Sequence, residues 1–305
     1  MRDTCLNEIY NLAKRDKRVV YIGSDLSPNT LENFKRDFPD RYFMEGISEA
    51  HIVGMAAGMA MNGYIPYINT IATFLTRRCF EQVVDDVAVH NLPVRFVASG
   101  GGLIYAPLGP THIAFDDMAI LRPIPNMTIV ACADAAEMRK FMPQTLSCKG
   151  PIYIRISGDP KVTGDLPFKI GRAQVVKKGK DVFLVTTGVC LKTVIDASSI
   201  LKRKNIESTI LHVPTVKPLD KKTLLSQLRA AKVIVTVEEG TIYGALGSGV
   251  AEVLAEANFG KPKKFQRIGI NDEFPVKYGS QAELMKYYRI TPENVVKNVL
   301  SLLKH

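Results

Sequence analysis

Cysteine is scarce in this sequence: five cysteines are scattered over 305 residues, and none forms a C-x-x-C pair. Disulfide frameworks and structural zinc sites need paired or closely spaced cysteines, so this spacing argues against both and fits reduced thiols. The first residues, Met1 to Glu8, mix acids with polar side chains where a signal peptide has an apolar core. We therefore expect a cytoplasmic protein that is not exported.

Long apolar runs are also absent. The longest one, Ile52–Met61, is far shorter than the roughly 20 residues that cross a bilayer, so no membrane segment is predicted. Acids are the minority charge, with 30 Asp and Glu against 40 Lys and Arg and a net charge of +10. The lysine clusters lack the interleaved aromatic residues of nucleic-acid-binding surfaces. The clusters are therefore expected to form solvated surfaces or to attract anionic small substrates or an acidic partner chain. Nucleic-acid binding is not predicted.

Several motifs of catalysis and nucleotide binding are missing. The sequence has no G-x-x-x-x-G-K-[ST], and its glycine groups at 100–102 and 244–249 do not fit G-x-G-x-x-G. It also has no nucleophile elbow G-x-S-x-G. His112 and Asp116 stand four residues apart, but no further ligand lies nearby in the sequence, so no metal site is predicted. A P-loop, a dinucleotide site and a serine-hydrolase site are all unsupported.

What the chain does contain is an alternation of short apolar segments with amphipathic ones. This pattern predicts α/β architecture, with two doubly wound domains that each have a mostly parallel sheet between helices. Turn-forming residues over 158–171 mark the boundary. We expect a first domain at 1–160, a linker at 161–175 and a second domain at 176–305. The predicted strands are 19–22, 41–44, 64–69, 94–98, 127–131, 152–156, 182–187, 208–213, 232–239 and 266–270. The predicted helices are 4–16, 29–37, 74–90, one that starts at 110, 190–204, 219–229, 244–258 and 291–304.

The segment Gly46-Ile47-Ser48-Glu49 begins the most informative of these helices. Ser48 is expected to cap the helix, and Glu49 lies in the first turn, where the helix dipole favours a carboxylate. The apolar run that follows predicts a buried helix. A carboxyl group at the mouth of such a helix is a candidate for acid–base work, although it could simply stabilise the helix end.

Functional groups collect at the carboxyl ends of strands in an open parallel sheet. By this rule one edge of the first domain should gather two acids, an aromatic side chain, a flexible glycine loop and an imidazole. These are Asp25, Glu49, Thr73-Phe74, 99–102 and His112.

Six short motifs resemble, in order and spacing, those of transketolase-type proteins. They are Gly46-Ile47-Ser48-Glu49, Ala72-Thr73-Phe74-Leu75, Gly109-Pro110-Thr111-His112, Arg122-Pro123-Ile124-Pro125-Asn126-Met127, Val216-Lys217-Pro218-Leu219-Asp220 and Thr236-Val237-Glu238-Glu239-Gly240. The resemblance covers essentially the whole chain and matches a pyrimidine-binding domain followed by a transketolase C-terminal domain. Neighbouring relatives are 1-deoxyxylulose-5-phosphate synthase and the beta chain of 2-oxo-acid dehydrogenases.

A part that these enzymes need is missing. They hold the diphosphate of thiamine diphosphate, together with Mg²⁺, through a domain with a G-D-G motif and a later Asn. Here Gly-Asp occurs only in Gly158-Asp159-Pro160 and Gly164-Asp165-Leu166, and neither fits that motif. The resemblance therefore implies one half of a split transketolase. A partner subunit would bind the diphosphate and Mg²⁺, and the two chains would share the coenzyme.

The resemblance also implies roles for individual residues. Glu49 would hydrogen-bond the pyrimidine N1′ of the coenzyme, Phe74 would stack on the aminopyrimidine ring, and Phe80 would complete that pocket. Asp25 matches an Asp near the coenzyme, with turn capping as the alternative. The cofactor, in this reading, performs the carbanion chemistry that the protein tunes.

On the substrate side, His112 matches the family's proton-handling histidine beside the substrate carbonyl. Arg155 matches a phosphate-binding arginine, and Arg77 matches another arginine in the deoxyxylulose relative. Either arginine could instead form an ordinary salt bridge. Leu108 and Gly100 depart from the family, because transketolases usually have a hydroxyl-binding Asp and a His at these places. A change in such groups alters which substrates are accepted, so the alternatives include a specialised sugar and a substrate derived from a ketoacid.

We therefore expect the pyrimidine-binding subunit of a two-component transketolase, which moves a two-carbon ketol unit between sugars or sugar phosphates. Helix 49–61, with Gly54 and Gly58 on one face, should pair two copies of this chain, and family analogy implies an α2β2 assembly. The alternatives are the beta subunit of a 2-oxo-acid dehydrogenase, a 1-deoxyxylulose-5-phosphate-synthase-like enzyme, and a non-catalytic regulatory subunit.

Overall fold

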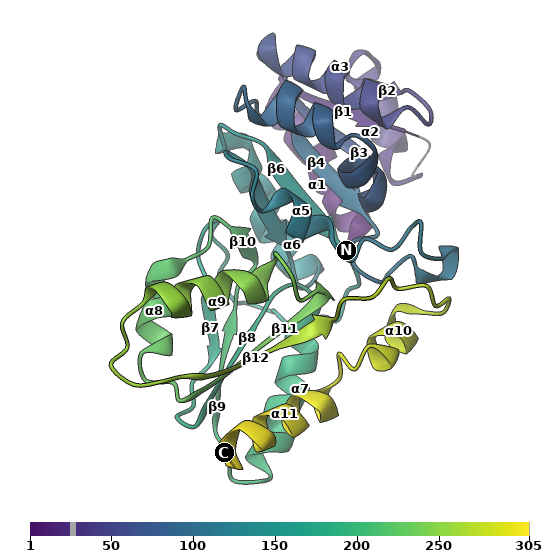
Figure 1. Cartoon of the computed structure of the whole chain (residues 1–305). Coiled ribbons are helices and arrows are strands. Elements are labelled where there is room, and N and C mark those ends of the chain that lie inside the picture. Colours follow the sequence, from purple (N-terminus) through teal and green to yellow (C-terminus); the bar gives the residue numbers. More distant parts are fainter. Residues whose placement is uncertain (25–28, 305) are drawn as a thin grey trace.

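The computed structural model describes residues 1–24 and 29–304 and contains two sheets, one above the other in Figure 1. The first sheet has seven strands in the order β10-β5-β6-β4-β3-β1-β2, and all pairs are parallel except β10 with β5. Its strands are β1 (Val19–Gly23), β2 (Tyr42–Met44), β3 (Ile65–Ile71), β4 (Arg95–Ser99), β5 (Thr128–Ala131), β6 (Ile152–Ile156) and β10 (Thr215–Lys217).

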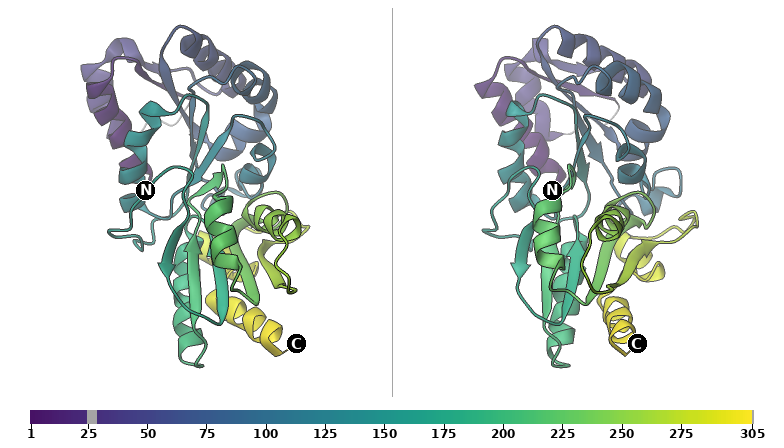
Figure 2. Two further views of the ribbon diagram at one scale, coloured as in Figure 1. Left: turned by 90° about the vertical axis from the view of Figure 1, so that its left-hand side faces the viewer. Right: turned by 60° about the vertical axis from the view of Figure 1, so that its left-hand side comes forward.

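Helices cover both faces of this sheet, as Figure 2 shows. The helices of the first domain are α1 (Arg2–Arg15), α2 (Glu32–Asp37), α3 (Glu49–Met61), α4 (Phe80–Gln82), α5 (Asp117–Leu121) and α6 (Ala135–Phe141). Apolar side chains of α1 and α6 pack on one face, and those of α3 and α5 pack on the other. Strands β1, β3, β4 and β6 are buried along their whole length, which is why most of their residues are apolar.

Shorter helical turns complete the first domain. Residues 74–90, predicted as one helix, form two π-helical turns on either side of α4. The π turns are η3 (Phe74–Arg78) and η4 (Val83–Ala88), and the 3-10 turns are η1 (Asn29–Leu31), η2 (Pro39–Arg41), η5 (Ala106–Leu108) and η6 (Met142–Ser147).

The second sheet has five strands in the order β12-β11-β8-β9-β7, parallel except for β7 with β9. Helices α7 and α11 cover one face, and α8 and α9 cover the other. Its strands are β7 (Gln174–Lys177), β8 (Val182–Thr186), β9 (Ser208–His212), β11 (Val233–Thr241) and β12 (Lys264–Ile270). Its helices are α7 (Cys190–Lys202), α8 (Lys221–Leu228), α9 (Leu246–Glu256), α10 (Gln281–Tyr287) and α11 (Pro292–Lys304).

This architecture confirms the predicted pair of doubly wound domains, with some differences in detail. The helix expected to start at Pro110 starts only at Asp117, because the chain first turns at 109–112 and Ala114 then pairs with Gly101 and Gly102. β7 and β10 were not predicted. β7 starts inside the expected linker 161–175, at Gln174, and β10 crosses from the second half of the chain to pair with the first sheet. No helix in the two described ranges has the length and apolar character needed to cross a membrane.

Helix α3 differs from its prediction in two ways. The Ser48 hydroxyl donates to the carbonyl of Glu45 at 2.9 Å instead of capping the helix. The helix is also buried on one side only: Gly58 and Met61 are exposed, whereas the buried residues are Glu49, Ile52, Val53, Ala56, Ala57 and Ala60. Of the two glycines predicted to share one face, Gly58 is open, whereas a Cβ on Gly54 would lie 3.7 Å from a carboxylate oxygen of Asp86.

Candidate active site

Glu49 is delivered to the carboxyl edge of the first sheet by the backbone that leaves β2. The amide of Glu45 donates to the carbonyl of Gly23 at the end of β1, at 3.0 Å, and Gly46 turns with a φ of 72°. Glu49 then opens α3, and its side chain is 1% exposed. The fold therefore places a carboxylate at a helix N-terminus, inside the protein, next to the ends of the central strands.

Arg78 is the charged partner of this carboxylate. Its Nη1 donates to Glu49 Oε2 at 2.7 Å, whereas Glu49 Oε1 is buried and accepts no hydrogen bond from any residue the structure describes. A buried acceptor without a donor costs about 1–3 kcal/mol, so such atoms are uncommon. Oε1 is therefore suited to an N–H donor that comes from outside the chain.

Phe74 and His112 continue this arrangement. The guanidinium carbon of Arg78 lies 4.0 Å from the centroid of the Phe74 ring. The ring of His112 meets Phe74 at a centroid distance of 5.2 Å and an angle of 67°. Glu49, Arg78, Phe74 and His112 thus form one continuous group, which we call the Glu49 cluster. The expectation that functional groups collect at the carboxyl ends of parallel strands had named three of its four members, Glu49, Phe74 and His112.

The position of His112 follows from a tight turn. Its backbone N–H donates to the carbonyl of Gly109 at 3.0 Å, and its Nδ1 lies 2.9 Å from the hydroxyl of Thr111. The side chain is half-buried. With Nδ1 engaged by its neighbour, Nε2 is the ring nitrogen left for a further hydrogen bond.

Below the cluster, the thiol of Cys79 donates to the carbonyl of Phe74 at 3.2 Å. Burial, and then the negative charge of Glu49, raises the pKa of Cys79 to about 12. The thiol stays neutral at physiological pH, so Cys79 is a packing residue and not a nucleophile.

Two other residues, Asp25 and Phe80, were predicted for coenzyme binding. Asp25 lies outside the described residues. Phe80 opens α4 with 37% of its surface exposed, so its ring is available to a neighbouring group but is not part of a packed core.

Arg77 turns away from Glu49 and pairs with Asp116. Its Nη2 and Nε lie 2.6 to 3.1 Å from the carboxylate oxygens of Asp116, and Nη2 also donates to the carbonyl of Ile113 at 3.2 Å. Asp116, which stood four residues from His112 in the sequence, is thus the counter-ion of an arginine. In this arrangement Arg77 has little free charge for a phosphate.

Arg155 lies in a buried network between the domains. Its Nε donates to Asp117 at 2.8 Å, and its Nη2 donates to the backbone carbonyl of Glu239 on β11 at 2.7 Å. The arginine is 3% exposed. Burial pulls its pKa down, but the charges of Asp117 and Glu239 raise it above its ordinary value. This environment favours an interdomain structural role over the predicted phosphate contact.

Glu239 closes the network from the second domain. Its carboxylate accepts hydrogen bonds from the Ser157 hydroxyl at 2.8 Å, the Gln281 amide at 2.6 Å and the Leu103 backbone N–H at 2.9 Å. A Cβ on Gly102 would lie 2.4 Å from this carboxylate, and Gly102 also has a φ of 73°. The glycines at 100–102, expected to form a flexible loop, are therefore required by close packing.

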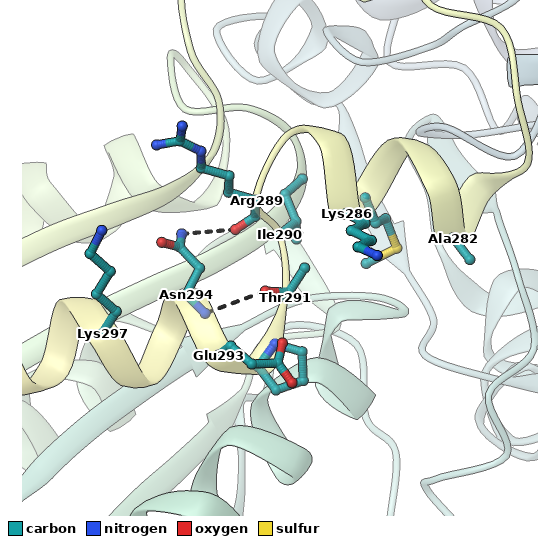
Figure 3. Close-up of a pocket in the computed structure, with 10 residues that line it drawn as sticks. Ala282, Lys286, Arg289, Ile290, Thr291, Glu293, Asn294 and Lys297 are labelled. Atoms are coloured by element: carbon teal, nitrogen blue, oxygen red, sulfur yellow. Dashed lines mark hydrogen bonds between the residues drawn. The ribbon is translucent and has the colours of Figure 1, made fainter.

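A separate cavity of about 760 Å³ lies between α10 and α11 (Figure 3). Lys286, Arg289 and Lys297 line it, and Asn294 Nδ2 donates to the carbonyl of Arg289 at 2.8 Å. All of its lining residues fall between Ala282 and Lys297, so it shares none with the Glu49 cluster.

Comparison with known proteins explains this arrangement. The family models for the transketolase pyrimidine binding domain and the transketolase C-terminal domain match residues 1–159 and 171–295. The chain belongs to the transketolase family, whose members depend on thiamine diphosphate.

Some relatives are similar to this chain over nearly their full length. The 6-deoxy-6-sulfo-D-fructose transketolase subunit SqwH of a Clostridium species is 33% identical, over 97% of this chain and 92% of the relative. One subunit of the apulose-4-phosphate transketolase of Actinobacillus succinogenes is 34% identical, over 93% of this chain and 92% of the relative.

Other relatives are longer. The 1-deoxy-D-xylulose-5-phosphate synthase of Symbiobacterium thermophilum is 38% identical over 97% of this chain, and the match covers 46% of that enzyme. The chain thus spans about half the length of these synthases.

Solved structures agree with the fold. A split-gene transketolase, solved as an inactive beta4 tetramer, superposes with a TM-score of 0.89 at 33% identity, over 99% of this chain and 98% of the other. Transketolase of Pichia stipitis, at 19% identity and a TM-score of 0.80, shares the fold and extends beyond it, since the match covers 46% of that chain.

Sequence reasoning missed Arg78. Phe74 and Arg78 are four residues apart, a spacing that places two side chains on the same face of a helical segment. That spacing was the available signal. It could not show which carboxylate the arginine would meet, because Glu49 is 29 residues away in the chain.

Proposed function

We propose that this chain is the pyrimidine-binding subunit of a two-component, thiamine-diphosphate-dependent transketolase. The observation that supports this most directly is the buried carboxylate of Glu49, whose Oε1 lacks a donor in the described chain. The aromatic face of Phe74 lies next to it, reached through Arg78. A carboxylate acceptor beside a stacking surface fits the flat, N–H-donating pyrimidine ring of the coenzyme.

The residues of the Glu49 cluster divide the work as follows. Glu49 uses Oε1 to hold a proton against the pyrimidine N1′. Phe74 and Phe80 exclude water from the ring. His112 uses Nε2 to exchange a proton with the substrate carbonyl. When bound, thiamine diphosphate supplies the electron sink for breaking and forming the carbon–carbon bond of the ketol. This chain contributes the two groups that position protons, Glu49 at the coenzyme and His112 at the substrate.

The diphosphate and Mg²⁺ belong, in this proposal, to a partner subunit. The chain matches only the pyrimidine and C-terminal domains of its family, and the similar split-gene transketolase was solved as an inactive beta4 tetramer. Copies of this chain pair through α3. On the exposed side of that helix, a Cβ added to Gly58 would meet no atom within 4 Å, and Met61 is 57% exposed. An α2β2 assembly follows, with sugars or sugar phosphates as substrates.

A second candidate is a reaction of the 1-deoxyxylulose-5-phosphate-synthase type. The observation in its favour is the 38% identity to such an enzyme over nearly the whole of this chain. Both candidates use the same Glu49 cluster and differ in the donor, which is a ketose in one and pyruvate in the other.

Reconstitution tests the proposal. The chain is combined with the subunit that carries the diphosphate-binding half, Mg²⁺ and thiamine diphosphate, and two-carbon transfer from a ketose to an aldehyde is followed. We expect transfer only when both chains are present. Release of CO2 from pyruvate without ketose cleavage would select the second candidate, and full activity of the partner alone would leave this chain a regulatory subunit.

A further inference from the structure

Arg78 makes the two contacts that the proposed function assigns to the aminopyrimidine ring. Its Nη1 donates to Glu49 at 2.7 Å, and its guanidinium lies 4.0 Å from the centroid of the Phe74 ring. A guanidinium is planar, donates N–H groups from within its plane and stacks on aromatic faces. In shape and in hydrogen bonding it therefore resembles a flat nitrogen heterocycle with an N–H donor.

The two groups compete for the same ring face. Carbon atoms in optimal contact are about 3.5–4.0 Å apart, so a guanidinium at 4.0 Å already covers that face of Phe74. A second flat group on this face requires Arg78 to move. We propose that Arg78 is an internal stand-in for the aminopyrimidine ring, and that thiamine diphosphate binds only after displacing its guanidinium from between Glu49 and Phe74.

The exposure of the two partners suits such an exchange. The Glu49 side chain is 1% exposed and needs a donor or counter-charge wherever Arg78 goes, because an unpaired buried carboxylate is strongly unfavourable. The Arg78 side chain is 45% exposed, so its charged end reaches water by rotation of the side chain alone. Displacement passes the pairing of Glu49 from the arginine to the ring without moving the backbone.

Arg78 thus sets the affinity for the coenzyme, since every binding event must break the pair with Glu49. This inference rests on the proposed function, because it takes Glu49 and Phe74 as the ring's contacts. It adds a residue that opposes binding, whereas the other members of the cluster favour it.

Coenzyme binding by the complex with the partner subunit tests the inference. The variant is Arg78→Met, which keeps the apolar stem and removes the charge and the flat group. The dissociation constant of thiamine diphosphate is measured by calorimetry with Mg²⁺ in excess. We expect the variant to bind about tenfold more tightly than the natural chain, equivalent to ~1.4 kcal/mol.

Arg41→Met is the matched control. Arg41 also stacks on a phenylalanine, Phe38, at 4.0 Å, but its Nη1 donates to backbone carbonyls and it has no contact with Glu49. Its loss should leave the dissociation constant unchanged. If Arg78→Met does not fold, Arg78→Lys, which keeps the charge without the flat group, should also bind more tightly, by a smaller factor.

Unchanged or weaker coenzyme binding in a folded Arg78 variant would overturn the inference. That outcome is distinct from failure of the proposed function, in which the natural complex itself would bind no thiamine diphosphate. A thermal-shift measurement adds a second reading, because the increase in Tm on adding the coenzyme should be larger for Arg78→Met than for the natural chain.

Discussion

Two clusters in this chain pair an arginine with a carboxylate, and they differ in how exposed the arginine is. Around Arg155, the carboxylate of Glu239 accepts three hydrogen bonds, and the arginine is 3% exposed. Around Arg78, the arginine is 45% exposed, and one oxygen of Glu49 has no donor in the described part of the chain. Each cluster keeps one buried carboxylate oxygen without a donor among the described residues, Oδ1 of Asp117 and Oε1 of Glu49, so completeness does not separate them. The difference is exposure: the buried Arg155 bonds to both domains, whereas the half-exposed Arg78 can move into water.

The largest effect should come from breaking the buried network around Arg155. Arg155→Met leaves Asp117 and Glu239 buried without their counter-charge, and the loss of one partner of a buried ion pair costs about 3–5 kcal/mol. Urea unfolding of the purified chain measures this. Arg78→Met is the comparison, and it should cost less, because it leaves one buried carboxylate without its counter-charge instead of two. Equal losses in the two variants would remove the distinction between the clusters.

Glu49→Gln should have the next largest effect, on turnover. The amide cannot share a proton with a ring nitrogen as a carboxyl group does, so we expect kcat of the reconstituted complex to fall at least ~10²-fold. Unfolding experiments serve as the control, since a catalytic loss without unfolding separates chemistry from structure. Turnover close to that of the natural chain would exclude the proposed role of Glu49.

His112→Ala should lower kcat/KM on the order of tenfold, because water can replace part of a general acid–base group at the substrate. The loss should depend on the acceptor sugar, whereas that of Glu49→Gln should be uniform. Comparing two aldehyde acceptors of different length measures this. The same loss for every acceptor would place His112 with the coenzyme instead of the substrate.

The smallest effect concerns Glu238, which is adjacent to Glu239 of the Arg155 network but accepts its hydrogen bonds from the backbone. Its carboxylate accepts from the N–H groups of Leu246 and Gly247 at the start of α9, at 3.0 and 2.7 Å. Burial raises the pKa of Glu238 to about 7 from its ordinary value of 4.5. The folded chain therefore binds a proton more tightly than the unfolded chain does. The associated stability is complete below pH 4.5 and is lost as the pH rises to 7.

Glu238→Gln imitates the protonated form, so it should flatten this dependence. The fall in the free energy of unfolding between pH 4.5 and 7 should shrink by on the order of 1 kcal/mol. Urea unfolding at a series of pH values measures the slope. An identical slope in the variant would show that other groups carry the dependence.

Much of this protein was determined by the sequence alone. The alternation of apolar and amphipathic segments predicted two doubly wound domains, and the position of groups after strands predicted that Glu49, Phe74 and His112 share an edge. These features are local, because the periodicity of apolar residues and the ends of strands can both be recognised from consecutive residues. The short β10, which pairs with β5 across the domain boundary, has no such local pattern and was missed.

The tertiary structure alone decided how the charges pair. Arg77 and Arg78 are adjacent in the sequence and carry the same group, yet one meets Asp116 and the other meets Glu49. The sequence left Arg155 open to a phosphate contact or a salt bridge, and the folded chain pairs it with Asp117 and Glu239. The energy of a charge depends on its distance to partners far along the chain and on its exposure to water, and only the folded chain sets these two quantities.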